Sequence, residues 1–169
     1  TSSKELLIGL LDNDKSQKAS SLLADHLENG IKPEEAVSII TFLAENVSKI
    51  KSENISEILH SFHHADQPLN NDIFFDCLFV NYLKFKKDTQ VAIFHLTLQK
   101  DDDNSEKQFK RFLDAYGEDL LYLNEAQIEL CIKAPLNISV NLFKAISNEK
   151  IKDSIYLYFL KQLQENKIN

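Results

Sequence analysis

One helix ends and the next begins within Leu22-Leu23-Ala24-Asp25-His26-Leu27-Glu28-Asn29-Gly30-Ile31-Lys32-Pro33. Gly30 follows the apolar residues at the place where a helix commonly closes with a left-handed residue. Pro33 lacks a backbone N–H and is tolerated in the first turn of a helix. Glu34 and Glu35 then stand against the positive end of the helix dipole. The stretch therefore predicts two helices joined by a short turn.

The three prolines of the chain are spaced as a repeat protein would space them. Pro33 and Pro68 lie 35 residues apart, and Pro68 and Pro135 lie 67 apart, which is close to twice that interval. A period of about 33 to 35 residues is typical of helix-turn-helix repeats. The chain also has only three glycines, and this scarcity of turn formers disfavours an all-β protein.

Apolar residues at helical spacing predict ten helices joined by short turns. The first two, expected over residues 3–11 and 15–29, direct a common apolar set inward: Leu6, Leu7, Leu10, Leu11, Ala19, Leu22, Leu23 and Leu27. The next helices begin at Pro33 and Ser52. The fifth, over about 73–83, is apolar almost all round, so we expect it to be buried on both sides. The sixth begins at Asp88 or Thr89, the seventh follows the loop 101–105, and the last covers about 150–165.

Paired in order, these helices give five hairpins that start near residues 1, 33, 68, 103 and 135. The predicted fold is all-α: a right-handed array of about five antiparallel helical hairpins, an α-solenoid of about ten helices, forming a single helical-repeat domain over residues 1–169. A hairpin cannot bury its apolar face alone, so stacking creates one continuous core. We expect a spine of phenylalanines between the hairpins: Phe74, Phe75, Phe79, Phe109, Phe112 and Phe143.

The turn Gly30-Ile31-Lys32-Pro33, with the leucine-rich helix end before it, resembles the close of a pentatricopeptide repeat. A looser match covers residues 142–154, which resemble the mid-repeat turn of that family. A tetratricopeptide array has nearly the same period, so that related family stays open. In pentatricopeptide proteins the first helix of each repeat reads RNA bases. Carried over at a 35-residue step, the resemblance implies RNA contacts at Thr41, Asn71, Asp76, Arg111 and Asn141.

The charge of the chain counts against a general nucleic-acid surface. It has 26 acidic and 19 basic residues, a net charge of −7, and Arg111 as its only arginine. One basic concentration could still contact RNA or a partner: Lys84, Lys86, Lys87, Lys100, Lys107, Lys110 and Arg111. Phe85, Phe109 and Phe112 lie among these residues and would stack on bases if exposed. The alternative is that the lysines cover helix surfaces and the aromatic residues are core.

No combination of residues predicts catalysis or a cofactor. His60 and His64, at i and i+4 on a helix, are a weak candidate pair for a divalent metal. The alternative is a polar helix end, where imidazolium is favourable to the dipole. The chain has no P-loop, nucleophile elbow or dinucleotide-binding sequence, so we expect neither an enzyme nor a cofactor.

The two cysteines indicate a reducing compartment. Cys77 and Cys131 both stand among apolar residues at helical spacing, so we interpret them as reduced core residues, with a disulfide between them as the less favoured alternative. This favours an intracellular protein, and leaves the cytoplasm and an organelle such as the mitochondrion both open. No apolar stretch approaches the ~20 residues that span a bilayer, so no membrane span is expected.

These observations predict a non-catalytic helical-repeat module that binds a protein or peptide partner as an adaptor or scaffold. The first alternative is a pentatricopeptide-type module that binds single-stranded RNA in organellar RNA metabolism. The second is a fragment of a larger helical assembly.

Overall fold

The computed structural model describes residues 2–63, 72–97 and 103–116, together with Asp153, Tyr156, Leu157, Leu160, Lys161, Gln164 and Glu165. Within this part of the chain there are helices and turns but no β-strand, so the all-α class is confirmed there. The chain forms two compact units, Thr1–Leu96 and Thr97–Asn169. That both belong to a single repeat domain over residues 1–169 stays a prediction.

The helices begin and end close to their predicted limits. They are α1 (Ser3–Leu10), α2 (Ser16–Glu28), α3 (Pro33–Glu45), α4 (Ser52–His63), α5 (Asp72–Asn81), the 3-10 helix η1 (Tyr82–Lys84), α6 (Lys87–Thr97) and α7 (Asp103–Tyr116). The first seven predicted helices are therefore confirmed. The predicted eighth and ninth helices lie outside the described residues, as do Pro68 and Pro135. In the predicted last helix, the described residues from Asp153 to Gln164 are helical.

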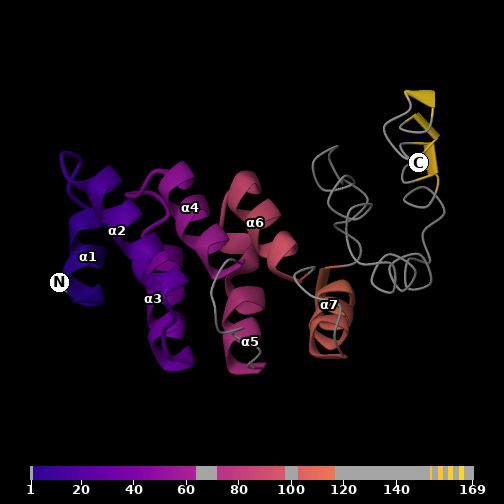
Figure 1. Ribbon diagram of the computed structural model, residues 1–169, viewed down its shortest axis with the longest axis horizontal. Helices are drawn as coiled ribbons and strands as arrows, with labels where there is room; N and C mark the ends of the chain where they lie inside the picture. Colours follow the sequence, from indigo (N-terminus) through magenta and orange to yellow (C-terminus); the bar gives the residue numbers. More distant parts are fainter. Residues whose placement is uncertain are drawn as a thin grey trace. The chain divides into compact units, whose positions relative to one another are not determined.

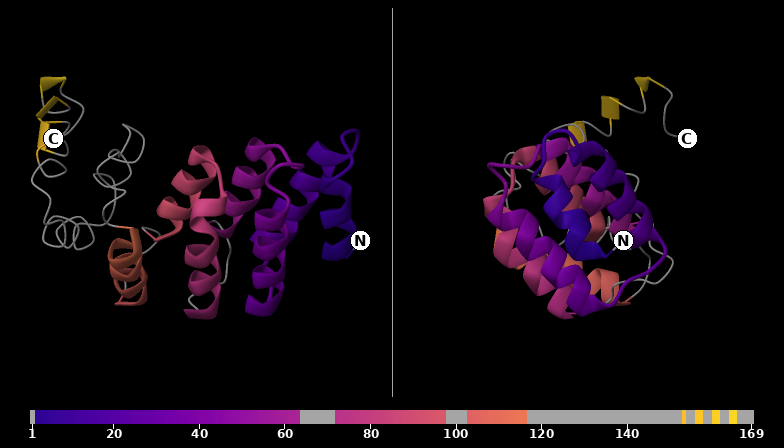
Figure 2. Two further views of the ribbon diagram at one scale, coloured as in Figure 1. Left: turned by 180° about the vertical axis from the view of Figure 1, so that it is seen from behind. Right: turned by 90° about the vertical axis from the view of Figure 1, so that its left-hand side faces the viewer.

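Helices α1 to α6 of the first unit lie in two rows (Figures 1 and 2). Helix α3 contacts both α1 and α5, and these three form the odd row. Helix α2 contacts α4, and together with α6 they form the even row. The two rows meet where α1 packs on α2. None of the described helices is long and apolar enough to cross a bilayer.

The turn between α2 and α3 has the predicted geometry. Gly30 adopts a φ of 97°, in the left-handed region, and its N–H donates to the Leu27 carbonyl at 3.1 Å. The side chain of Asn29 donates to the Asp25 carbonyl at 3.0 Å, which satisfies another group at the helix end. Pro33 occupies the first turn of α3. The closing glycine and the opening proline are both confirmed.

Replacing Gly30 by alanine is expected to lower the free energy of unfolding by about 1 kcal/mol, because a Cβ disfavours the left-handed conformation. No atom lies within 4 Å of the place where that Cβ would stand, so the loss comes from the backbone and not from a clash. Gly30→Asn should cost less, because asparagine tolerates this conformation. Urea denaturation of the two variants measures the difference. Equal losses would show that the backbone conformation at Gly30 is not the cause.

A buried polar network joins α2 to α4. The side-chain amide of Asn54 donates to Ser16 Oγ at 2.8 Å, and Ser20 Oγ donates to Glu57 Oε2 at 2.8 Å. Ser16, Ser20 and Asn54 are all buried. Because buried polar groups are costly without partners, this network favours one alignment of α2 on α4.

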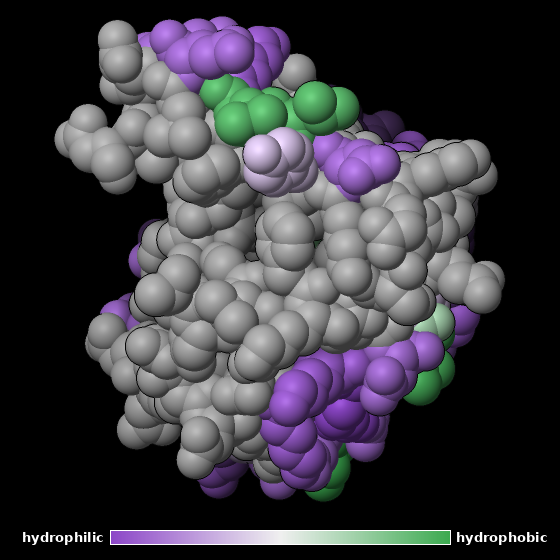
Figure 3. Space-filling model, turned by 90° about the vertical axis from the view of Figure 1, so that its right-hand side faces the viewer, coloured by the Kyte–Doolittle hydropathy of each residue, from purple (hydrophilic) through white to green (hydrophobic). Residues whose placement is uncertain are grey.

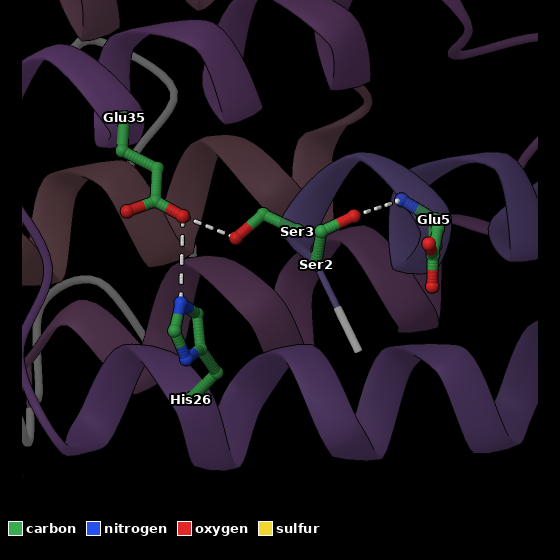
Figure 4. Close-up of polar contacts among 5 residues, drawn as sticks. All are labelled: Ser2, Ser3, Glu5, His26 and Glu35. Carbon is green, nitrogen blue, oxygen red and sulfur yellow. Dashed lines mark hydrogen bonds and ion pairs between the residues drawn. The ribbon is translucent and has the colours of Figure 1, made fainter.

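A second polar cluster brings α1, α2 and α3 together at Glu35 (Figure 4). Ser3 Oγ donates to the Glu35 carboxylate, and His26 Nε2 lies 3.4 Å from the same oxygen. At the start of α1, Ser2 Oγ accepts the backbone N–H of Glu5 at 3.3 Å, as expected of a helix cap. The His26 and Glu35 side chains are exposed enough for water to screen their attraction, so the pair contributes little to stability.

Aromatic rings fill the contact between α4 and α5. The ring centroids of Phe62 and Phe74 lie 5.2 Å apart, those of Phe74 and Phe75 lie 5.1 Å apart, and those of Phe75 and Phe79 lie 5.8 Å apart. Three members of the predicted spine are thus buried in the first unit. In the second unit Phe112 is buried and its ring lies 5.7 Å from that of Tyr116. Phe143 and the side chain of Phe109 lie outside the described part.

The prediction that the fifth helix is buried on both sides is wrong. Ile73 is 62% exposed and Val80 is 74% exposed, and Leu83, in η1, is 68% exposed. Leu11 and Leu22, expected to point inward, are exposed as well. Ile73 and Val80 are exposed because α5 packs on its neighbours along one side only, as the burial of Phe74 and Leu78 shows. The apolar residues on the opposite side remain in contact with solvent.

Candidate functional site

Three exposed apolar side chains form a strip along α5 and η1. Ile73 and Val80 are seven residues, or two helical turns, apart and therefore lie on the same side of α5. Leu83 follows in η1. Single exposed apolar residues are ordinary, but several on one side of a helix mark a candidate interaction site. We call these three residues the α5 strip.

The line of contact between α3 and α5 borders this strip. Thr41 Oγ1 donates to the Val37 carbonyl at 2.8 Å and lies 3.6 Å from Cys77 Sγ. Cys77 Sγ lies 3.8 Å from the same carbonyl. Cys77 is a free thiol and is half-buried at this contact between the two helices. Ile73 and Val80, one turn before and after Cys77, lie on the same side of the helix.

Acidic residues continue this surface onto α3. Glu34, Ser38 and Glu45 are exposed. Ser38 follows Glu34 by four residues and Glu45 follows it by eleven, so all three lie on one side of α3. Across α1, α3 and α5 together, six residues are acidic and only Lys4 is basic. We use the name docking face for three parts taken together. They are the α5 strip, the contact line at Val37, Thr41 and Cys77, and these three residues of α3. Its chemistry suits binding through apolar contact and negative charge.

The structure describes three of the residues that the pentatricopeptide resemblance implies, each on a different helix. Thr41 lies half-buried at the contact line, where its hydroxyl bonds within its own helix. Asp76 is exposed on α5. Arg111, on α7 in the second unit, is half-buried, and its Nη1 donates to Gln108 Oε1 at 2.6 Å. Asn71 and Asn141 lie outside the described residues.

The described lysines of the predicted basic concentration fall into two groups, one in each unit. Lys84, Lys86 and Lys87 are exposed at the turn from η1 to α6. Lys107 and Lys110 are exposed on α7. Figure 3, which views the molecule from the right-hand side of Figure 1, shows hydrophilic side chains gathered low on this face. Lys100 lies outside the described residues.

Two of the aromatic residues among these lysines, Phe85 and Phe112, have described side chains. Phe85 is 4% exposed and Phe112 is 1% exposed, so the exposure that stacking on bases requires is missing at both. The alternative interpretation, that they are core residues, is confirmed. Without accessible rings at Phe85 and Phe112, the lysines beside them lack the base stacking, tolerant of sequence, that proteins binding single strands use.

The candidate metal pair stays incomplete. His60 is exposed on α4, and His64 lies outside the described residues. Within the part of the chain that the structure describes, no three histidine, cysteine, aspartate or glutamate side chains come together as metal ligands would.

The α5 strip was not predicted from the sequence, because the helix is apolar almost all round. One signal was present: Asp76 lies between Ile73 and Val80 on the same side of α5 and is exposed. A carboxylate is rarely buried without a partner, so its position marks the side that faces solvent.

Comparison with family models finds no matching family. Curated proteins and solved structures likewise give no match. We therefore base the function on the docking face itself.

Proposed function

We propose that the protein is a non-catalytic helical-repeat module, an adaptor or scaffold that binds a protein or peptide partner through its docking face. The observation that carries this proposal is the α5 strip, where three large apolar side chains are more than half exposed. Removing such side chains from water favours association with a protein surface. The acidic character of the odd row supports the same choice, because it repels the phosphates of a nucleic acid.

The finer fold belongs to this proposal: a right-handed array of about five hairpins of the pentatricopeptide or tetratricopeptide kind. Two rows built from alternate helices support it. So does a local feature that recurs after 35 residues. Asn46 and Asn81, at the ends of α3 and α5, each donate a side-chain amide to the carbonyl four residues earlier at 2.8 Å.

One observation favours a second candidate, binding of single-stranded RNA. The exposed Lys84, Lys86 and Lys87 offer three cations within four residues. The buried Phe85 and the hydroxyl of Thr41, which bonds within its own helix, favour the protein-binding candidate instead.

Two measurements distinguish the candidates. A photo-crosslinking amino acid in place of Val80 should attach to a protein, while the same amino acid in place of Ser21, exposed in the even row, should not. Gel shifts with single-stranded RNA at physiological salt should show no tight complex. Sequence-dependent RNA binding that Lys84→Ala, Lys86→Ala and Lys87→Ala abolish would overturn the adaptor function.

A further inference from the structure

From the docking face we infer the chemistry of the partner: a basic amphipathic helix that lies along α3 and α5. This inference rests on the proposed function and names its partner class. The first support is the spacing of the apolar side chains. Ile73 and Val80 are two turns apart, which is the pitch at which an amphipathic helix repeats its own apolar residues. The partner helix would end before Leu83, because the exposed Lys84, Lys86 and Lys87 that follow would repel its cations.

The second support is the position of the acidic residues beside the strip. Glu34 and Glu45 stand on the exposed side of α3, eleven residues apart, and so roughly 16 Å apart along the helix axis. A helix lying on the strip parallel to α3 would meet them with residues three turns apart on its flank. Lysine or arginine at those two places would complement both carboxylates.

The third support is that Glu45 is unfavourable for its own helix. It is the last residue of α3, where the dipole favours a cation, and the last turn of α3 contains no basic residue. No hydrogen bond or ion pair joins the Glu45 carboxylate to another described residue. Helix capping explains Glu34, in the first turn, but it does not explain Glu45. A positively charged partner does.

The test uses the intact protein and a labelled synthetic helix of about 18 residues, or five turns, with leucine on one side and lysine on the other. Fluorescence anisotropy should detect binding, and a peptide with glutamate in place of every lysine should bind far more weakly. Replacing both Ile73 and Val80 by serine should weaken binding of the lysine peptide by about tenfold or more.

The decisive comparison is Glu45→Lys against Glu28→Lys. Glu28 is also exposed and is also the last residue of a 13-residue helix, α2, but it lies in the even row. Both substitutions change the net charge equally and relieve the same dipole. Glu45→Lys should weaken the lysine peptide by about fivefold, because attraction becomes repulsion, while Glu28→Lys should leave it nearly unchanged.

Three results would overturn the inference. The glutamate peptide could bind as well as the lysine peptide, the two charge reversals could weaken binding equally, or neither peptide could bind. If neither peptide binds, protein crosslinking from position 80 would still support the proposed function. A failure of this inference can therefore be distinguished from a failure of the proposed function.

Discussion

Replacing Phe74 by alanine is expected to lower the free energy of unfolding by about 3–5 kcal/mol. Phe74 is 1% exposed, and its ring lies 5.2 Å from that of Phe62 on α4 and 5.1 Å from that of Phe75. The substitution removes the apolar contact and leaves a cavity that helices on both sides cannot close completely. Urea denaturation followed by circular dichroism measures the loss. Phe74→Leu, which fills more of the space, should be less damaging.

Val80→Ala is the matched control on the same helix. Because Val80 is exposed, its truncation should change the free energy of unfolding by no more than about 0.5 kcal/mol. Alanine is also the better helix former, which offsets part of any loss. A loss at Val80 as large as that at Phe74 would mean that α5 is buried on both sides after all, and the docking face would not exist.

The second large effect is expected at Gln90. Its side-chain amide donates to the carbonyls of Tyr82 at 3.2 Å and Phe85 at 3.0 Å, and so links α6 to η1. Gln90, Tyr82 and Phe85 are all buried. Gln90→Ala leaves these carbonyls without that donor, and we expect the free energy of unfolding to fall by about 2–3 kcal/mol. The Tyr82 carbonyl still accepts the Phe85 N–H at 3.3 Å. The loss of stability should therefore be smaller than if both carbonyls were left without any donor.

Gln17→Ala serves as the control, because Gln17 is exposed on α2 and its loss should be nearly neutral. Urea midpoints for the two variants give the comparison. If both substitutions are neutral, the amide of Gln90 does not hold the η1 turn.

Local chemistry predicted the helices well. Pro33 begins α3, Ser52 begins α4 and Gly30 closes the turn after α2, because caps and turn residues act through their immediate neighbours. Inward residues such as Leu6, Leu23 and Leu27 also followed from apolar spacing. The site was less predictable. Phe85, offered as a stacking ring, is core, and Ile73 and Val80, expected to be buried, are exposed.

The amino-acid sequence by itself determined where the described helices begin and end and that the chain is all-α in that part, because hydrogen bonding, capping and periodicity are set within a few residues. Which side of α5 faces water was decided only by the tertiary structure. Ile73, Phe74, Phe75 and Val80 are all apolar, so burial would be favourable for any of them. Packing on α3 and α4 covers one side of the helix and leaves the opposite side, with Ile73 and Val80, exposed to water.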